Sequence, residues 1–98
     1  MKLTKAMNGN ALTIEIEGRV DTVTSPELEK MINESSDKAE SLLLDFAKVE
    51  YISSAGLRVL LAAHKAMSKK SGMKIKNAGE DIMEIFEVTG FTDILNIV

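Results

Sequence analysis

The first part of the chain alternates apolar and polar residues. Within Ala11–Glu17 every second residue is a leucine or isoleucine, and threonine or glutamate lies between them. This period of two is typical of a strand with one buried face. The preceding Asn8-Gly9-Asn10 is a turn signal, because asparagine and glycine tolerate positive φ. We therefore expect an antiparallel hairpin, with residues 2–7 as its other strand.

Helical spacing replaces this alternation in two further segments. Apolar residues three and four apart predict a helix from Thr24 to about Ser35-Ser36. Thr24 and Glu27 have the spacing of a capping box, which would satisfy free N–H groups at the helix start. A later helix is predicted from Gly79-Glu80-Asp81, whose acids suit the helix dipole, to a stop at Gly90.

The middle of the chain holds the most apolar run. Ser41–Phe46 predicts a strand buried on both faces, followed by a loop over residues 47–52. A helix is predicted from Ser54 to Lys70. The alternation returns in Met73–Lys76, a fourth strand, and residues 94–98 are apolar enough for a short edge strand.

The predicted order, β-β-α-β-α-β-α-β, indicates a single α/β domain over residues 1–98. Strands that alternate with helices lie parallel and are joined by right-handed crossovers. The initial antiparallel hairpin makes the sheet mixed but mostly parallel, with three or more helices packed on it.

The helix that begins at Ser54 has two apolar faces. Its bulky residues share one face and are expected to meet the sheet: Leu57, Leu60, Leu61, His64 and Met67. The opposite face is small and smooth, with a cation beside it: Ala55, Arg58, Val59, Ala62 and Ala66. A partner helix or strand would fit such a face. Alanine is also the best helix former, so the pattern is explained equally well without a partner.

Two serines, Ser53 and Ser54, lie where the buried strand passes into this helix. A serine there often caps the helix, because its hydroxyl accepts from a free backbone N–H. The same place favours a phosphate, since the N-terminus of a helix carries partial positive charge. One cap is needed and two hydroxyls are present, so capping and phosphorylation can coexist; Ser54 is the preferred modification site.

An enzyme is not supported by the sequence. A nucleophilic serine needs a base within hydrogen-bond reach, and the only histidine, His64, lies about 15 Å along the same helix from Ser54. The chain lacks cysteine, a nucleophile elbow, a phosphate loop, a dinucleotide fingerprint and a cluster of metal ligands. We expect no catalytic residue, no metal and no cofactor.

Charge and hydropathy limit the kinds of partner that the sequence predicts. The net charge is −3, yet no acidic residue occurs between Tyr51 and Ala78, where the lysines are most readily explained as a solvated helix face. Without interleaved aromatic residues this stretch does not predict direct nucleic-acid binding. No segment has the length of a signal sequence or a membrane span, so a cytoplasmic protein without membrane insertion is expected.

Two segments resemble a known family. Leu43-Leu44-Asp45-Phe46 with Tyr51-Ile52-Ser53-Ser54-Ala55-Gly56-Leu57 is similar to the signature of STAS domains, within these most of all to the bacterial anti-sigma factor antagonists. Upstream, Gly18-Arg19-Val20-Asp21 and Ser25-Pro26-Glu27-Leu28 resemble a second stretch of the family pattern. The likeness extends over essentially the whole chain.

The resemblance implies a protein-binding switch. Such antagonists bind an anti-sigma factor that is also a serine kinase of the GHKL type, and they are released when that kinase phosphorylates them. A PP2C-type phosphatase restores binding. By motif the phosphoacceptor is Ser54; many members have aspartate where this chain has Ser53, which leaves Ser53 as the alternative. Asp21 matches an acidic position near that serine.

The predicted partner surface combines the resemblance with the small-residue face of the helix. Gly56 is expected to leave room for the approaching kinase. A second reading implied by the family is a STAS subunit that is never phosphorylated and serves in a transporter or a stress-signalling complex. The predicted partner-binding residues are Asp21, Ser53, Ser54, Ala55, Arg58, Val59, Ala62 and Ala66.

Overall fold

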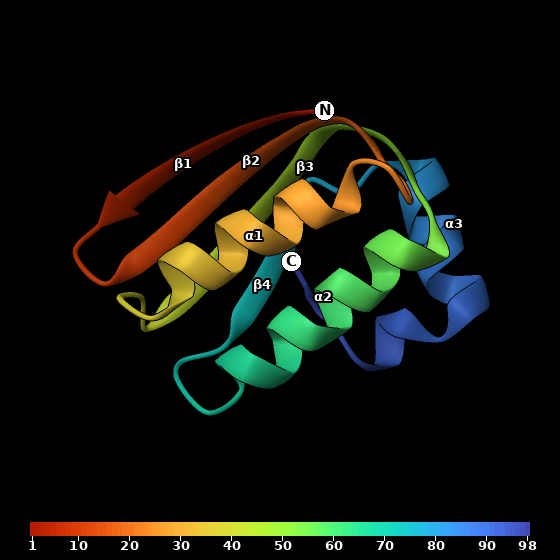
Figure 1. Ribbon diagram of the computed structural model, residues 1–98. Helices are drawn as coiled ribbons and strands as arrows, with labels where there is room; N and C mark the ends of the chain where they lie inside the picture. The colour runs from red at the N-terminus through yellow and green to blue at the C-terminus, as the bar shows by residue number, and fades with distance from the viewer.

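The structure, a computed structural model, describes all 98 residues and has the predicted element order. Figure 1 shows helices lying over a twisted sheet, with β1 at one edge. The elements are β1 (Lys2–Asn8), β2 (Ala11–Val20), α1 (Ser25–Ser36), β3 (Ser41–Ile52), α2 (Ser54–Met67), β4 (Met73–Lys76), α3 (Glu80–Thr89), the 3₁₀ turn η1 (Phe91–Asp93) and β5 (Asn96–Ile97).

The sheet confirms the predicted fold class. Its strand order is β1-β2-β3-β4-β5, with β1 antiparallel to β2 and every later pair parallel. Strand order therefore equals chain order, so each crossover moves in the same direction across the sheet. Since such crossovers are right-handed, their helices collect on one face. None of the helices is long and apolar enough to cross a membrane.

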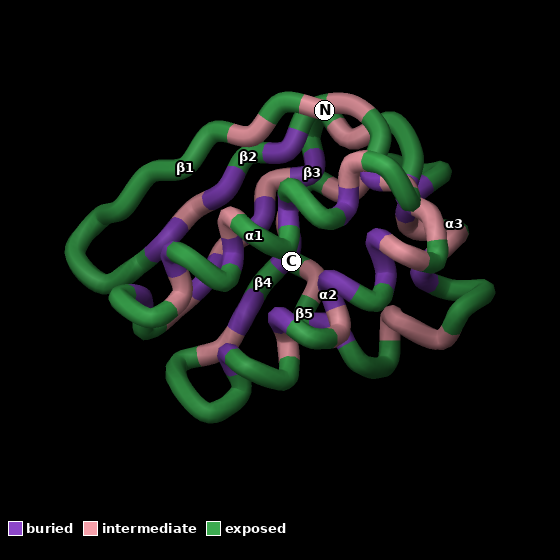
Figure 2. The backbone as a smooth tube through the Cα atoms, viewed as in Figure 1, coloured by how far each residue is buried: buried purple, intermediate pink, exposed green.

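One-sided coverage corrects the expectation that β3 is buried on both faces. Leu42, Leu44 and Phe46 are buried under the helices, whereas Leu43 and Asp45 on the other face are only half-buried. Figure 2 shows the buried positions concentrated along the inner strands and the inward sides of the helices. Successive leucines at positions 42–44 predict burial on both faces of the strand, but only alternate residues reach the core.

The predicted loop over residues 47–52 is wrong, because β3 continues to Ile52. The alternation fails there because β3 carries one extra residue at each of two irregularities in its pairing with β2. The first lies between Asp45 and Lys48, and the second between Val49 and Tyr51. After each extra residue, the side chains that faced the core face away from it, and the reverse. The regular alternation that would identify a strand in the sequence is therefore lost.

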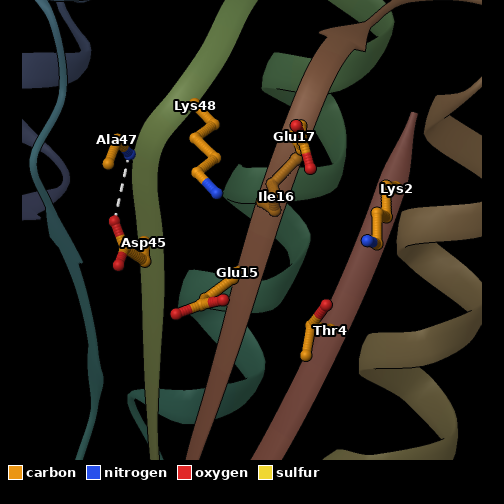
Figure 3. Close-up of a pocket in the computed structure, with 8 residues that line it drawn as sticks. All are labelled: Lys2, Thr4, Glu15, Ile16, Glu17, Asp45, Ala47 and Lys48. Carbon is orange, nitrogen blue, oxygen red and sulfur yellow. Dashed lines mark hydrogen bonds between the residues drawn. The ribbon is translucent and has the colours of Figure 1, made fainter.

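Asp45 holds the first irregularity in place (Figure 3). Its Oδ1 accepts from the backbone N–H of Ala47 at 3.0 Å, the dashed line in Figure 3. The same oxygen accepts from Nδ2 of Asn77 at 3.1 Å. Partial burial would raise the pKa of Asp45, but these hydrogen bonds, with Lys76 and Lys48 nearby, outweigh it and leave the pKa below the ordinary 3.8. The carboxylate thus provides a hydrogen-bond acceptor for the N–H of Ala47, a residue that the bulge leaves without a partner on β2.

Replacing Asp45 by alanine is therefore expected to destabilise the fold by about 1 kcal/mol at neutral pH, since two hydrogen bonds are lost. A lowered pKa gives stability that is present above the unfolded value and lost as pH falls through the folded value. The difference between wild type and Asp45→Ala should accordingly shrink below about pH 4. Urea unfolding at pH 7 and pH 3 measures the difference in unfolding free energy between the two proteins. A difference that is larger at pH 3 would contradict a stabilising role of the Asp45 carboxylate.

Candidate functional site

Asp21 and Ser53 leave the sheet side by side. Val20 of β2 and Ile52 of β3 are partners in the last rung of their parallel ladder. The backbone N–H of Ser53 donates to the carbonyl of Val20 at 2.8 Å, which fixes the start of α2 against the end of β2. The carboxyl ends of adjacent parallel strands are a usual place for functional residues.

The two serines have different surroundings. Ser53 is the N-cap of α2: its backbone is extended, and its Oγ accepts from the N–H of Gly56 at 3.4 Å. Ser54 is the first residue of the helix, is exposed, and its hydroxyl makes no hydrogen bond within the chain. The structure thus assigns the cap, which the sequence left open, to Ser53, and leaves the hydroxyl of Ser54 unengaged.

Gly56 does not leave room for a partner as expected; it is buried. A Cβ at this position would lie 2.7 Å from Cγ1 of Ile52 and 2.8 Å from Cγ1 of Val20. Real Cβ atoms do not approach other atoms so closely. Glycine is therefore required so that the first turn of α2 can pack directly on the ends of β2 and β3.

Asp21 organises the loop between β2 and α1. Its Oδ1 accepts from the backbone N–H groups of Val23 at 3.0 Å and Thr24 at 3.1 Å. The bond from the Thr24 backbone is the main reason that the pKa of Asp21 lies below its ordinary value, and Arg19 beside it acts in the same direction. Asp21 is consequently an anion at neutral pH, close to the start of α2.

The predicted capping box at α1 is not formed. The side chain of Thr24 makes no cap hydrogen bond; its Oγ1 donates to the carbonyl of Arg19 at 2.7 Å and accepts from the N–H of Asp21 at 2.9 Å. Asp21 accepts from the backbone N–H of Thr24, which Glu27 would bind in a capping box, since aspartate forms this kind of turn readily.

Arg19 and Tyr51 were missed by the sequence prediction. They are partners in the β2–β3 register, and the guanidinium carbon of Arg19 lies 4.5 Å from the centre of the Tyr51 ring. Nε of Arg19 is 3.7 Å from Oδ2 of Asp21. Tyrosine and arginine are, with tryptophan, the residue types enriched in binding hot spots. The sequence pattern does not predict this pair, because it places residue 51 in a loop, where Tyr51 would have no strand partner.

The small-residue face of α2 is only partly free. Ala62, Ala66 and Arg58 are exposed and Ala55 is half-buried, but Val59 is 7% exposed, which corrects its placement on the outer face. Val59 lies in a groove of about 120 Å³ between α1 and α2. The groove is lined by Glu29, Ile32, Asn33 and Ser36 of α1 and by Val59, Ala62, Ala63, Ala66 and Met67 of α2.

The inward face of α2 is rotated toward α1 relative to the prediction. Leu57, Leu60 and Met67 are buried as expected, and so is Ala63. Leu61 and His64 are only half-buried, because α1 packs beside α2 on the opposite flank. Nδ1 of His64 is buried without a hydrogen-bond partner. His64 thus belongs to the boundary of the core, on a different part of α2 from Ser54.

Chemically the site is suited to binding. An exposed hydroxyl, an aspartate and a cation–aromatic pair lie around the start of α2, and an apolar groove runs along the rest of the helix beside α1. No group of three or more His, Cys, Asp or Glu side chains converges to hold a metal.

The STAS domain family matches residues 2–98. The anti-sigma-B factor antagonist of Bacillus subtilis is 29% identical over 92% of this chain and 84% of its own length. BtrV of Bordetella bronchiseptica, named as an anti-sigma factor antagonist, is 32% identical over 99% of this chain and 85% of its own length.

Solved structures share the fold. That of an anti-sigma factor antagonist from Mycobacterium paratuberculosis superimposes with a TM-score of 0.88 at 24% identity, covering 98% of this chain and 83% of that one. SpoIIAA in its unphosphorylated form gives a TM-score of 0.77 at 12% identity and covers 99% and 87% of the two chains. Its phosphorylated form gives 0.76 at 13% identity, covering 99% and 91%. From the family match and the two relatives, the chain is a STAS domain and belongs to the family of anti-sigma factor antagonists.

Proposed function

We propose that this protein binds an anti-sigma factor and is released from it when Ser54 is phosphorylated. Its partner is an anti-sigma factor that is also a serine kinase of the GHKL type, and a PP2C-type phosphatase restores the binding form. The protein acts by binding and carries out no catalysis of its own. The names of its relatives support the antagonist role.

The observation that carries the choice of residue is the contrast between the two serines. The hydroxyl of Ser53 caps α2, whereas that of Ser54 is exposed and free of hydrogen bonds. A kinase can reach a free hydroxyl at a helix start without breaking the cap. The backbone N–H groups and dipole of the first turn tolerate the phosphate that results.

The charges around Ser54 support release of the partner. A phosphate on Ser54 brings about −1.5 to −2 charge at neutral pH. Ser54 directly follows Ser53, which leaves the sheet beside the anionic Asp21. In the free protein this charge lies in water and is screened. In a complex that covers Ser54 the dianion would be desolvated next to a carboxylate, so the penalty falls mainly on the complex.

Intact-mass spectrometry after incubation with the cognate kinase and ATP tests the site. Wild type and Ser53→Ala should each gain one phosphate, and Ser54→Ala none. Ser53→Ala is the matched control because it removes a neighbouring hydroxyl and costs only about 1 kcal/mol through loss of the cap. Full modification of Ser54→Ala, with none on Ser53→Ala, would move the phosphoacceptor to Ser53.

A further inference from the structure

The outer edge of β1 is the only long free edge of the sheet. β1 has seven residues, pairs with β2 alone, and lies at the end of the strand order. The opposite edge is β5, with two residues. A free edge presents a row of unpaired backbone donors and acceptors, to which an extended peptide can add as a further strand.

A hollow of about 330 Å³ lies beside this edge, between β1 and the C-terminal part of α1. Met7 is 46% exposed at its rim, and the buried side chain of Leu12 forms part of its floor. Leu3, Lys5 and Met7 point to the helix side of the sheet, since their partners on β2 are core residues. A strand added to β1 would direct alternate side chains into this hollow.

The charges around the hollow select the occupant. Lys5 and Lys38 line it, and neither makes an ion pair within the chain. Its one acid, Glu34, is 4.0 Å from the amine of Lys30 and is thus already paired. A second copy of the chain is disfavoured, because antiparallel pairing of two β1 strands would bring Lys2 and Lys5 of both copies onto one short edge.

We propose that β1 is a second docking edge, which takes up an extended segment of a partner protein that carries apolar and acidic side chains on the same face. Backbone pairing to β1 would hold the segment, an apolar side chain would contact the exposed Met7, and a carboxylate would approach Lys5 and Lys38. The hollow lies at Leu12, which is eight positions from Val20 along β2, about 26 Å, so the hollow is remote from Ser54. This docking edge is separate from the phosphorylation switch proposed above. It stays available whether or not Ser54 is phosphorylated.

The probe is the blocked peptide Thr-Val-Thr-Glu-Thr-Val-Thr, in which valine and glutamate share one face, and its control has lysine in place of glutamate. With the full-length protein we expect the glutamate peptide to shift the amide resonances of β1, to slow their hydrogen exchange, and to bind with Kd of about 1 mM. The lysine peptide should bind at least about fivefold more weakly.

Lys5→Glu should reverse this preference, and Lys2→Glu, on the same strand but facing the open side of the sheet, should leave it unchanged. Ser54→Glu should bind both peptides as wild type does, which separates this result from that of the switch. Equal binding of both peptides, or shifts confined to other strands, would overturn the proposal. So would concentration-dependent shifts of β1 without peptide, which would identify a second copy as the occupant.

Discussion

Phosphorylation of Ser54 is expected to weaken binding to the anti-sigma factor by about thirty-fold to a few thousand-fold. The range follows from a penalty of about 2–5 kcal/mol for a buried, poorly paired charge in an interface. Most of the effect should be in the dissociation rate, because the free surface keeps its shape. Surface plasmon resonance with the phosphorylated and unphosphorylated forms measures both rate constants.

Two variants make this prediction specific. Ser54→Glu should lose affinity in the same direction but to a smaller extent, since glutamate has one charge and fewer acceptor oxygens than phosphate. Ser54→Ala should bind about as well as the unmodified protein, because no hydrogen bond of Ser54 is lost within the fold. The melting temperature of all forms should stay within a few degrees. Equal affinity of the phosphorylated and unmodified forms would refute the switch.

Gly56→Val is expected to destabilise the protein by about 3 kcal/mol or more, the upper range for overpacking a core. Even Gly56→Ala should cost about 1–3 kcal/mol, although alanine is the better helix former by about 1 kcal/mol. The reason is that a Cβ at this position meets Ile52 and Val20 at less than 3 Å, and the carbonyl of Val20 at 3.1 Å limits relaxation.

Urea unfolding of Gly56→Ala and Gly79→Ala checks this. Gly79 precedes α3, has a negative φ, and has no atom within 4 Å of the place a Cβ would take. Gly79→Ala should therefore cost at most about 1 kcal/mol, through a weaker cap. If both variants lost equally little, the close approach of α2 to the strand ends would not be what requires glycine at position 56.

The local sequence pattern was sufficient to predict most of the helices and strands, but not the second half of β3, which leads to the candidate site. The hairpin, the fourth strand and the helices were predictable, because each has a regular apolar period or a clear turn and cap signal. The second half of β3 was not. Its two irregularities depend on β2, which pairs against it, and on Asn77, which binds Asp45 from 32 positions further along the chain.

The same distinction applies to the candidate site. The local sequence alone predicted that Ser53 and Ser54 lie between a strand and a helix, beside the small-residue face of that helix. Which hydroxyl caps the helix, and whether Val59 faces outward, depended on how α2 sits against α1 and the strand ends. Helix periodicity gives the relative angles of side chains, but it does not give the rotation of the helix about its own axis.

The sequence by itself determined the single α/β domain, its element order, and the serine pair at the start of α2, because these depend on local periodicity and on motifs contiguous in the chain. Only the tertiary structure decided the one-sided coverage of the sheet, the burial of Gly56 and Val59, and the pairing of Arg19 with Tyr51. These features arise between segments that are distant in sequence, where close packing and strand register select one arrangement among several that the local pattern allows.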